Sequence, residues 1–148
     1  MKKLFFIKIL IIYLFFVSSI FAKESDYFIQ GMKLFNKKEF DKSKILFERD
    51  LVFNPKSEKS YLYLAKIFNK NNNIEEEEIN LSNVLLINPK NDEAIYLLAL
   101  IKIEQSDYKE AKELIDKLDL VCKSYCAKKE EIELKLKRLI PENAKNND

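Results

Sequence analysis

The 148-residue sequence contains no histidine and only one glycine. Without histidine, the chain lacks the usual general base, the commonest metal ligand and the base of Ser/His and Cys/His nucleophile pairs. A single glycine excludes the glycine-rich loops that bind dinucleotides and nucleoside triphosphates. We therefore expect a protein that is not an enzyme and that holds no cofactor and no metal.

Turn-forming residues are scarce, since only three prolines accompany the one glycine. This scarcity disfavours hairpins and sheets and predicts an all-α chain. A content of 47% hydrophobic and 34% charged residues at this length fits one globular domain. The 26 basic and 24 acidic residues are interspersed, whereas a nucleic-acid surface would need an uncompensated basic stripe. We therefore expect no nucleic acid among the partners.

The first 22 residues have the layout of an export signal. Two lysines at positions 2 and 3 precede an apolar run, and small residues lead to Ala22. This pattern predicts a signal peptide that is cleaved after Ala22. The alternative is an uncleaved membrane anchor, because residues 4–22 are about long enough to span a bilayer. Under either interpretation the positive-inside rule exports the remainder, so we expect a bacterial periplasmic protein, or one anchored in the inner membrane with its domain outside the cytoplasm.

A motif that ends in Asn-Pro-Lys occurs twice, with Pro55 and Pro89 separated by 34 residues. This spacing is typical of helical repeats, and a proline that follows a helix marks the boundary of a unit. Apolar positions at helical spacing predict helices over 25–37, 41–53, 57–70, 74–87, 91–105, 108–121 and 126–139. The expected organisation is a helical domain over 24–140, with repeats at 24–57, 58–91 and 92–125, a cap at 126–140 and a flexible tail at 141–148.

The repeats resemble the tetratricopeptide repeat (TPR) family over about residues 24–125. The matching positions are Tyr27, Gly31, Leu34, Ser43, Phe47 and Pro55 in the first unit, Tyr61, Leu64, Ala65, Phe68, Leu81 and Pro89 in the second, and Leu98, Ala99, Tyr108, Ala111 and Ile115 in the third. Lys123 stands where the third unit would have its proline. The resemblance implies a short α-solenoid of three helix pairs, which the last helix would cap.

Small residues recur on this lattice at Gly31, Ala65 and Ala99, where we expect the two helices of each unit to approach closely. Glu77 departs from the pattern, because it occupies a place where a small residue of the second helix should meet the first. We expect its side chain to bend out to water near the helix N-terminus. A functional acidic patch is the alternative.

The resemblance also implies a concave groove that is lined by the first helix of each unit. It places nine residues toward this groove, namely Phe28, Met32, Phe35, Leu62, Lys66, Asn69, Tyr96, Leu100 and Ile103. The alternative for each is packing within or between units. Such a groove, apolar with a basic spot, suits a helix or an extended apolar segment of a protein partner. A carboxylate clamp is not implied, since Met32, Glu93 and Leu97 replace most of the residues that form it in the heat-shock cochaperones.

Cys122 and Cys126 are the remaining chemical candidates. Three residues separate them, not the two of thioredoxin-like centres, and two thiols alone make a poor metal site. Two interpretations are left open, a structural disulfide across the last turn and a pair of unpaired, packed thiols.

The expected function is a TPR scaffold or adaptor that binds another protein of the cell envelope. The alternatives are a structural or assembly subunit of an envelope complex or homo-oligomer, and a redox factor that uses the two cysteines.

Overall fold

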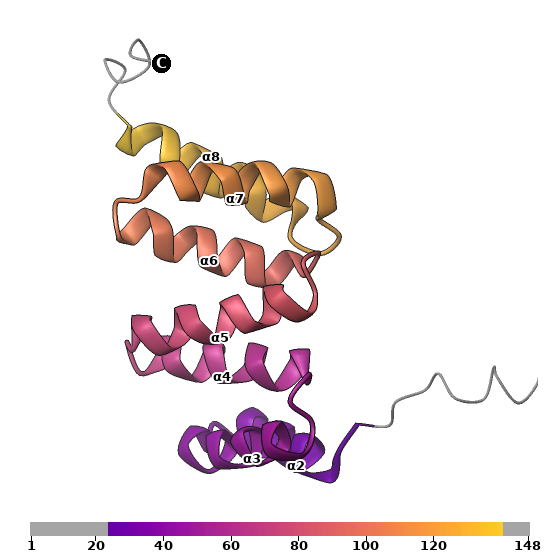
Figure 1. Cartoon of the computed structure of the whole chain (residues 1–148). Helices are drawn as coiled ribbons and strands as arrows, with labels where there is room; N and C mark the ends of the chain where they lie inside the picture. The colour runs from indigo at the N-terminus through magenta and orange to yellow at the C-terminus, as the bar shows by residue number, and fades with distance from the viewer. Residues whose placement is uncertain (1–23, 141–148) are drawn as a thin grey trace, which may run out of the picture.

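The structure, a computed structural model, describes residues 24–140, which form seven α-helices and no strand (Figure 1). The helices are α2 (Asp26–Asn36), α3 (Phe40–Phe53), α4 (Glu58–Lys70), α5 (Ile74–Ile87), α6 (Asp92–Glu104), α7 (Tyr108–Val121) and α8 (Cys126–Leu139). The predicted helices are confirmed, with every boundary within one residue. The predicted export signal and the predicted tail lie outside the described residues. None of the helices between residues 24 and 140 combines the length and the apolar character that a membrane span needs.

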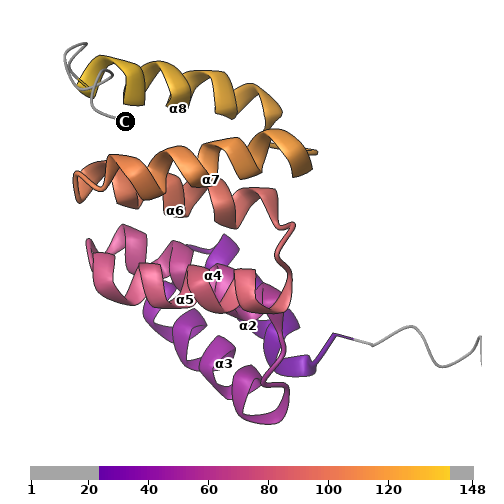
Figure 2. The same ribbon diagram turned by 45° about the horizontal axis from the view of Figure 1, so that its top comes forward.

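The helices form a stack of antiparallel pairs, α2 with α3, α4 with α5, and α6 with α7 (Figures 1 and 2). Each pair packs against the next, α8 follows on α7 and also touches α6, and the two ends of the stack lie far apart. This arrangement is the α-solenoid that the repeat pattern predicts.

Side-chain caps fix the start of five helices. The side-chain oxygen of the residue before the helix accepts a hydrogen bond from the N–H three residues later, which satisfies one of the free donors of the first turn. The capping residues are Ser25, Ser57, Asn73, Asn91 and Asp107.

The turn inside each helix pair has the same geometry in all three units. Lys38, Asn72 and Ser106 lie 34 residues apart and adopt positive φ angles of 63°, 54° and 62°. In each turn this residue donates its N–H to the carbonyl three residues earlier, and the next N–H reaches the carbonyl five residues earlier. These bonds define a Schellman motif, whose left-handed position glycine usually occupies. The one glycine of the sequence lies elsewhere.

That glycine, Gly31, lies where α2 packs tightly against α3. A Cβ atom built on Gly31 would be 2.7 Å from Cε1 of Phe47, whose ring is fully buried. Ser43 donates a hydrogen bond from its Oγ to the Gly31 carbonyl at 2.8 Å. Ala65 and Ala99 are also fully buried at the equivalent positions. The structure therefore confirms the close approach that the small residues predict.

The apolar core has two parts. An aromatic-rich part in the first two units centres on Phe28, Phe47, Leu64 and Ile67. A larger aliphatic part runs through the second and third units and ends on α8, where Ile132 and Leu136 are buried. The last helix thus covers apolar surface that would otherwise be exposed at the end of the stack.

Candidate binding groove

A groove runs over the faces of α2, α4 and α6. Its first part is a cavity of about 530 Å³, which we call the apolar pocket. The apolar side chains that line it are Phe28, Ile29, Met32, Leu62 and Tyr63. Lys33, Lys59 and Lys66 line the same cavity together with Glu24 and Glu93. Lys59 pairs with Glu24 and Lys66 with Glu93, so charged groups of both signs surround the apolar surface.

Two smaller cavities continue the groove. The middle pocket, of about 240 Å³, shares Lys66 with the apolar pocket and is also lined by Phe35 and Lys70. The acidic pocket, of about 220 Å³, shares Asn69, Glu77 and Leu97 with the middle pocket. Its other lining residues are Asn72, Ile74, Leu100, Ile101 and Glu104. Because neighbouring cavities share lining residues, the three form one continuous surface.

Seven of the nine predicted groove residues line these cavities. Phe28, Met32, Leu62 and Lys66 line the apolar pocket, Phe35 and Asn69 the middle pocket, and Leu100 the acidic pocket. Tyr96 instead packs against the ring of Tyr125, with the ring centroids 5.3 Å apart. Ile103 is only 4% exposed and belongs to the core, so packing accounts for its position. The role of all nine in binding stays a prediction.

The prediction that Glu77 bends out to water is wrong. Its side chain is 3% exposed, and the Nδ2 group of Asn69 donates to both carboxylate oxygens, at 3.1 and 3.0 Å. Burial raises the pKa of Glu77, the bond from Asn69 partly opposes this rise, and the charge of Glu104 adds to it. The amide partner makes burial between α4 and α5 tolerable. The repeat lattice contains a signal for this contact, since it places residue 77 where the second helix should meet the first, and Asn69 lies one helical turn after the small residue Ala65.

Lys66, which two pockets share, is held in place by its neighbours. Its Nζ lies 2.8 Å from Oε1 of Glu93 and 4.8 Å from the centre of the Tyr63 ring. The hydroxyl of Tyr125 donates to the same Glu93 oxygen at 2.6 Å. Burial, with the hydrogen bond to the Glu93 carboxylate, raises the pKa of Tyr125, which keeps this donor protonated. Sequence reasoning did not find this link between α4, α6 and the turn before α8.

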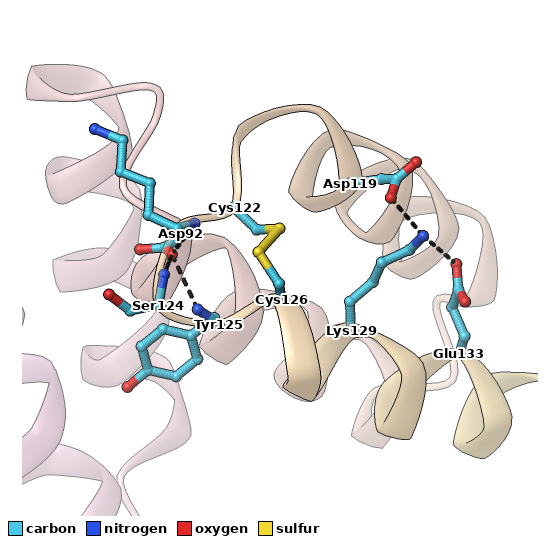
Figure 3. Close-up of a disulfide and its surroundings, with 9 residues drawn as sticks. Asp92, Asp119, Cys122, Ser124, Tyr125, Cys126, Lys129 and Glu133 are labelled. Carbon is cyan, nitrogen blue, oxygen red and sulfur yellow. Dashed lines mark hydrogen bonds and ion pairs between the residues drawn. A yellow bond between two sulfur atoms is a disulfide. The ribbon is translucent and has the colours of Figure 1, made fainter.

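The turn that contains Tyr125 is fixed in two ways (Figure 3). Cys122 and Cys126 form a disulfide across it. In addition, Oδ2 of Asp92 accepts hydrogen bonds from the N–H groups of Lys123, Ser124 and Tyr125, at 2.7, 2.6 and 3.1 Å. Burial alone would raise the pKa of Asp92, but the backbone donors around it outweigh that effect and lower the pKa. The repeat lattice contains a signal for Asp92 that sequence reasoning missed, because the equivalent positions, Glu24 and Glu58, are also acidic. Glu58 in the same way accepts hydrogen bonds from Asn88 and Asn91, in the turn that ends its unit.

Comparisons with known proteins identify the fold. No protein-family model and no curated protein matches the chain. Among solved structures, the TPR domain of Arabidopsis OM64 superposes with a TM-score of 0.69 at 18% identity, covering 77% of this chain and 93% of that chain. The TPR2B domain of yeast Sti1, in a complex with pHsp70, gives 0.68 at 16% identity, with 76% and 94% covered.

A third similar structure is the Yersinia enterocolitica type III secretion chaperone SycD, in complex with a peptide of the translocator YopD. It gives a TM-score of 0.62 at 9% identity, with 76% of this chain and 85% of that chain covered. These similarities show that the chain has the TPR fold, as the repeat pattern predicts.

Proposed function

We propose that this chain is a non-enzymatic protein-interaction module of the bacterial cell envelope, which binds a segment of a partner protein in its concave groove. The observation that supports this most directly is the continuous groove along α2, α4 and α6. Two structures of the same fold, the Sti1 domain and SycD, were solved in complexes with pHsp70 and with a peptide of YopD. The groove here is the corresponding candidate for a peptide site.

The chemistry of the groove favours a partner segment with apolar side chains. The apolar pocket is the largest of the three cavities, and its walls are aromatic and aliphatic. Filling such a surface with apolar groups removes about 25 cal/mol of unfavourable hydration for each Å² that is buried. Met32 lines this pocket and is only partly buried, so it is available to a partner.

The proposed location depends on residues 1–22, which lie outside the described residues. Their basic start and apolar run favour export, and the domain would then act outside the cytoplasm. N-terminal sequencing of the protein from the envelope fraction tests this. A chain that starts at Lys23 supports a cleaved signal, a chain that starts at residue 1 supports an anchor, and recovery from the cytosol alone contradicts export.

Site-specific photo-crosslinking in cells tests the binding function. A photoreactive phenylalanine analogue replaces Met32, which lines the apolar pocket, and in a matched control it replaces Gln30, which is exposed on the same helix outside the pocket. We expect Met32 to give a discrete crosslinked protein that Gln30 does not give. Equal products from both positions, or none from Met32, would contradict a groove interaction. A product of twice the chain's mass would favour the homo-oligomer over a separate partner.

A further inference from the structure

The turns between the units form a second surface, separate from the groove. This surface, which we call the turn edge, consists of residues 54–57, 88–91 and 122–125 with the last helical turns of α3, α5 and α7. These connections lie on one side of the stack, where the described chain also begins at residue 24 (Figures 1 and 2). We propose that the turn edge docks on the surface of a phospholipid bilayer. This inference goes beyond the groove function and does not depend on it.

Exposed apolar side chains follow the turn edge at the period of the repeat. Val52, Leu86 and Leu120 lie 34 residues apart, in the last turns of α3, α5 and α7, and are 73%, 81% and 84% exposed. Phe53 is 72% exposed and stacks on Tyr27 at the start of α2, with the ring centroids 5.5 Å apart. The core of the chain leaves these side chains in water, and the apolar boundary of a bilayer would bury them.

Each turn also presents an exposed lysine. These are Lys56, Lys90 and Lys123, and within residues 24–140 none of the three forms a salt bridge. Lys56 and Leu86 line one cavity of about 330 Å³, so a basic and an apolar group of successive units lie together there. Ammonium groups beside exposed apolar side chains match the phosphates and the acyl boundary of a bilayer surface.

The acids of the turn edge are mostly engaged within the protein. Glu58 accepts hydrogen bonds from two asparagine side chains of the following turn, and Asp92 accepts from three backbone N–H groups of the last one. Glu24 and Asp119 each pair with a lysine of the chain, and neither of these is a turn lysine. Asp26, at the start of α2, is exposed. Lipid phosphates would therefore meet three turn lysines whose ammonium groups are not held by these acids.

The sequence before residue 24 argues for a bilayer as the occupant. Residues 4–22 are the apolar run that is about long enough to span a membrane, and Ala22 precedes the start of α2 at Asp26 by four residues. An extended chain covers at most about 3.6 Å per residue, so an uncleaved anchor would hold the turn edge within about 15 Å of the bilayer. A second copy of the chain would give no reason for these groups to lie on the side at which that run joins the domain.

The depth of two probes in vesicles tests the inference with the full chain. An environment-sensitive fluorophore is attached at Leu120→Cys or, in a second protein, at Lys109→Cys, and the native cysteines stay in their disulfide. Both positions are exposed near opposite ends of α7, and Lys109 lies on the side away from the turn edge. The vesicles contain phosphatidylethanolamine and phosphatidylglycerol, with a spin-labelled lipid as quencher.

Two triple variants on the Leu120→Cys background test the side chains. The turn-edge variant carries Lys56→Gln, Lys90→Gln and Leu86→Gln. The matched control, Lys135→Gln, Lys137→Gln and Leu134→Gln, removes the same groups from exposed positions of α8. All six side chains are exposed, so both proteins should fold, and circular dichroism checks this.

We expect the lipid to quench the probe at position 120 severalfold more than the probe at 109. The turn-edge variant should lose most of this difference, and the control variant should keep it. Equal quenching at both positions, or none at either, would overturn the proposal, since a tether alone would not bring the third unit to the lipid. A blue shift at 120 without quenching would mean that a second copy covers the turn edge and would overturn it as well. None of these outcomes bears on the groove, which the crosslinking at Met32 tests separately.

Discussion

The carboxylate of Asp92, at the start of α6, accepts a hydrogen bond from the backbone N–H of Tyr125, 33 residues later in the sequence. The same oxygen accepts from the two preceding N–H groups, so one side chain fixes the whole turn before α8. Because the Tyr125 side chain also bonds to Glu93, this turn connects the cap to the helix that lines the groove. Lys123 replaces the expected proline at this place, and its N–H, which proline would lack, is one of the three donors.

Asp92→Ala should destabilise the protein. The substitution removes three bonds to one charged acceptor, for which we expect a loss of about 2–3 kcal/mol in urea unfolding. Since the folded state lowers the pKa of Asp92, its contribution is present above the unfolded pKa and is lost as the pH falls through the lower, folded pKa. The difference between wild type and variant should therefore shrink in acid.

Asp116→Asn serves as the control for Asp92. It removes an exposed acid that, within residues 24–140, forms an ion pair with Lys112 alone, four residues earlier on the same helix. Such pairs contribute a few tenths of a kcal/mol, so this variant should unfold close to the wild type. Equal losses from both substitutions would mean that the turn does not depend on Asp92.

Gly31→Ala should also destabilise the protein, although alanine is the better helix former by about 1 kcal/mol. The new methyl group would lie 2.7 Å from the Phe47 ring, which is fully buried and cannot move aside without disturbing the core. Overpacking of this kind costs about 1–3 kcal/mol, so we expect a net loss of about 1 kcal/mol in thermal or urea unfolding. Phe47→Leu should make the alanine less harmful, and a double-mutant cycle measures this coupling. Additive losses would contradict a direct clash.

The sequence was sufficient to predict the helices and much of the groove, because both follow from the 34-residue lattice. Apolar spacing and Pro55 and Pro89 set the helix boundaries, and the first helices supply most of the lining residues, to which α5 adds Ile74 and Glu77. The contacts of Glu77 and Asp92 were not predicted. Glu77 departs from the repeat, whose other units have Ser43 and Ala111 at this position, and its burial against Asn69 follows from the packing of α4 against α5. Asp92 follows the repeat, but its three hydrogen bonds depend on the backbone of the turn before α8, which only the packed structure brings to it.

The left-handed turns offer a stabilising substitution. Ser106 has a φ of 62°, which costs a residue with a Cβ about 1 kcal/mol and costs glycine little. Ser106→Gly should therefore raise the free energy of unfolding by about 0.5–1 kcal/mol in urea titrations. Ser82→Gly is the matched control, because Ser82 is exposed in the interior of α5, where glycine should lower stability by a similar amount. Two changes of the same sign would contradict the turn geometry.

Glu77→Gln tests the buried carboxylate through its pH dependence. Because burial raises the pKa of Glu77 in the folded state, folding favours the protonated form, and wild-type stability falls as the pH rises from the unfolded pKa through the folded pKa. The glutamine variant lacks this titration, so the wild type should gain stability relative to the variant as the solution is acidified. Urea unfolding at several pH values measures the difference, with Glu113→Gln as the control for loss of an exposed acid. A difference between wild type and Glu77→Gln that stays constant with pH would show that the Asn69 amide compensates fully for burial.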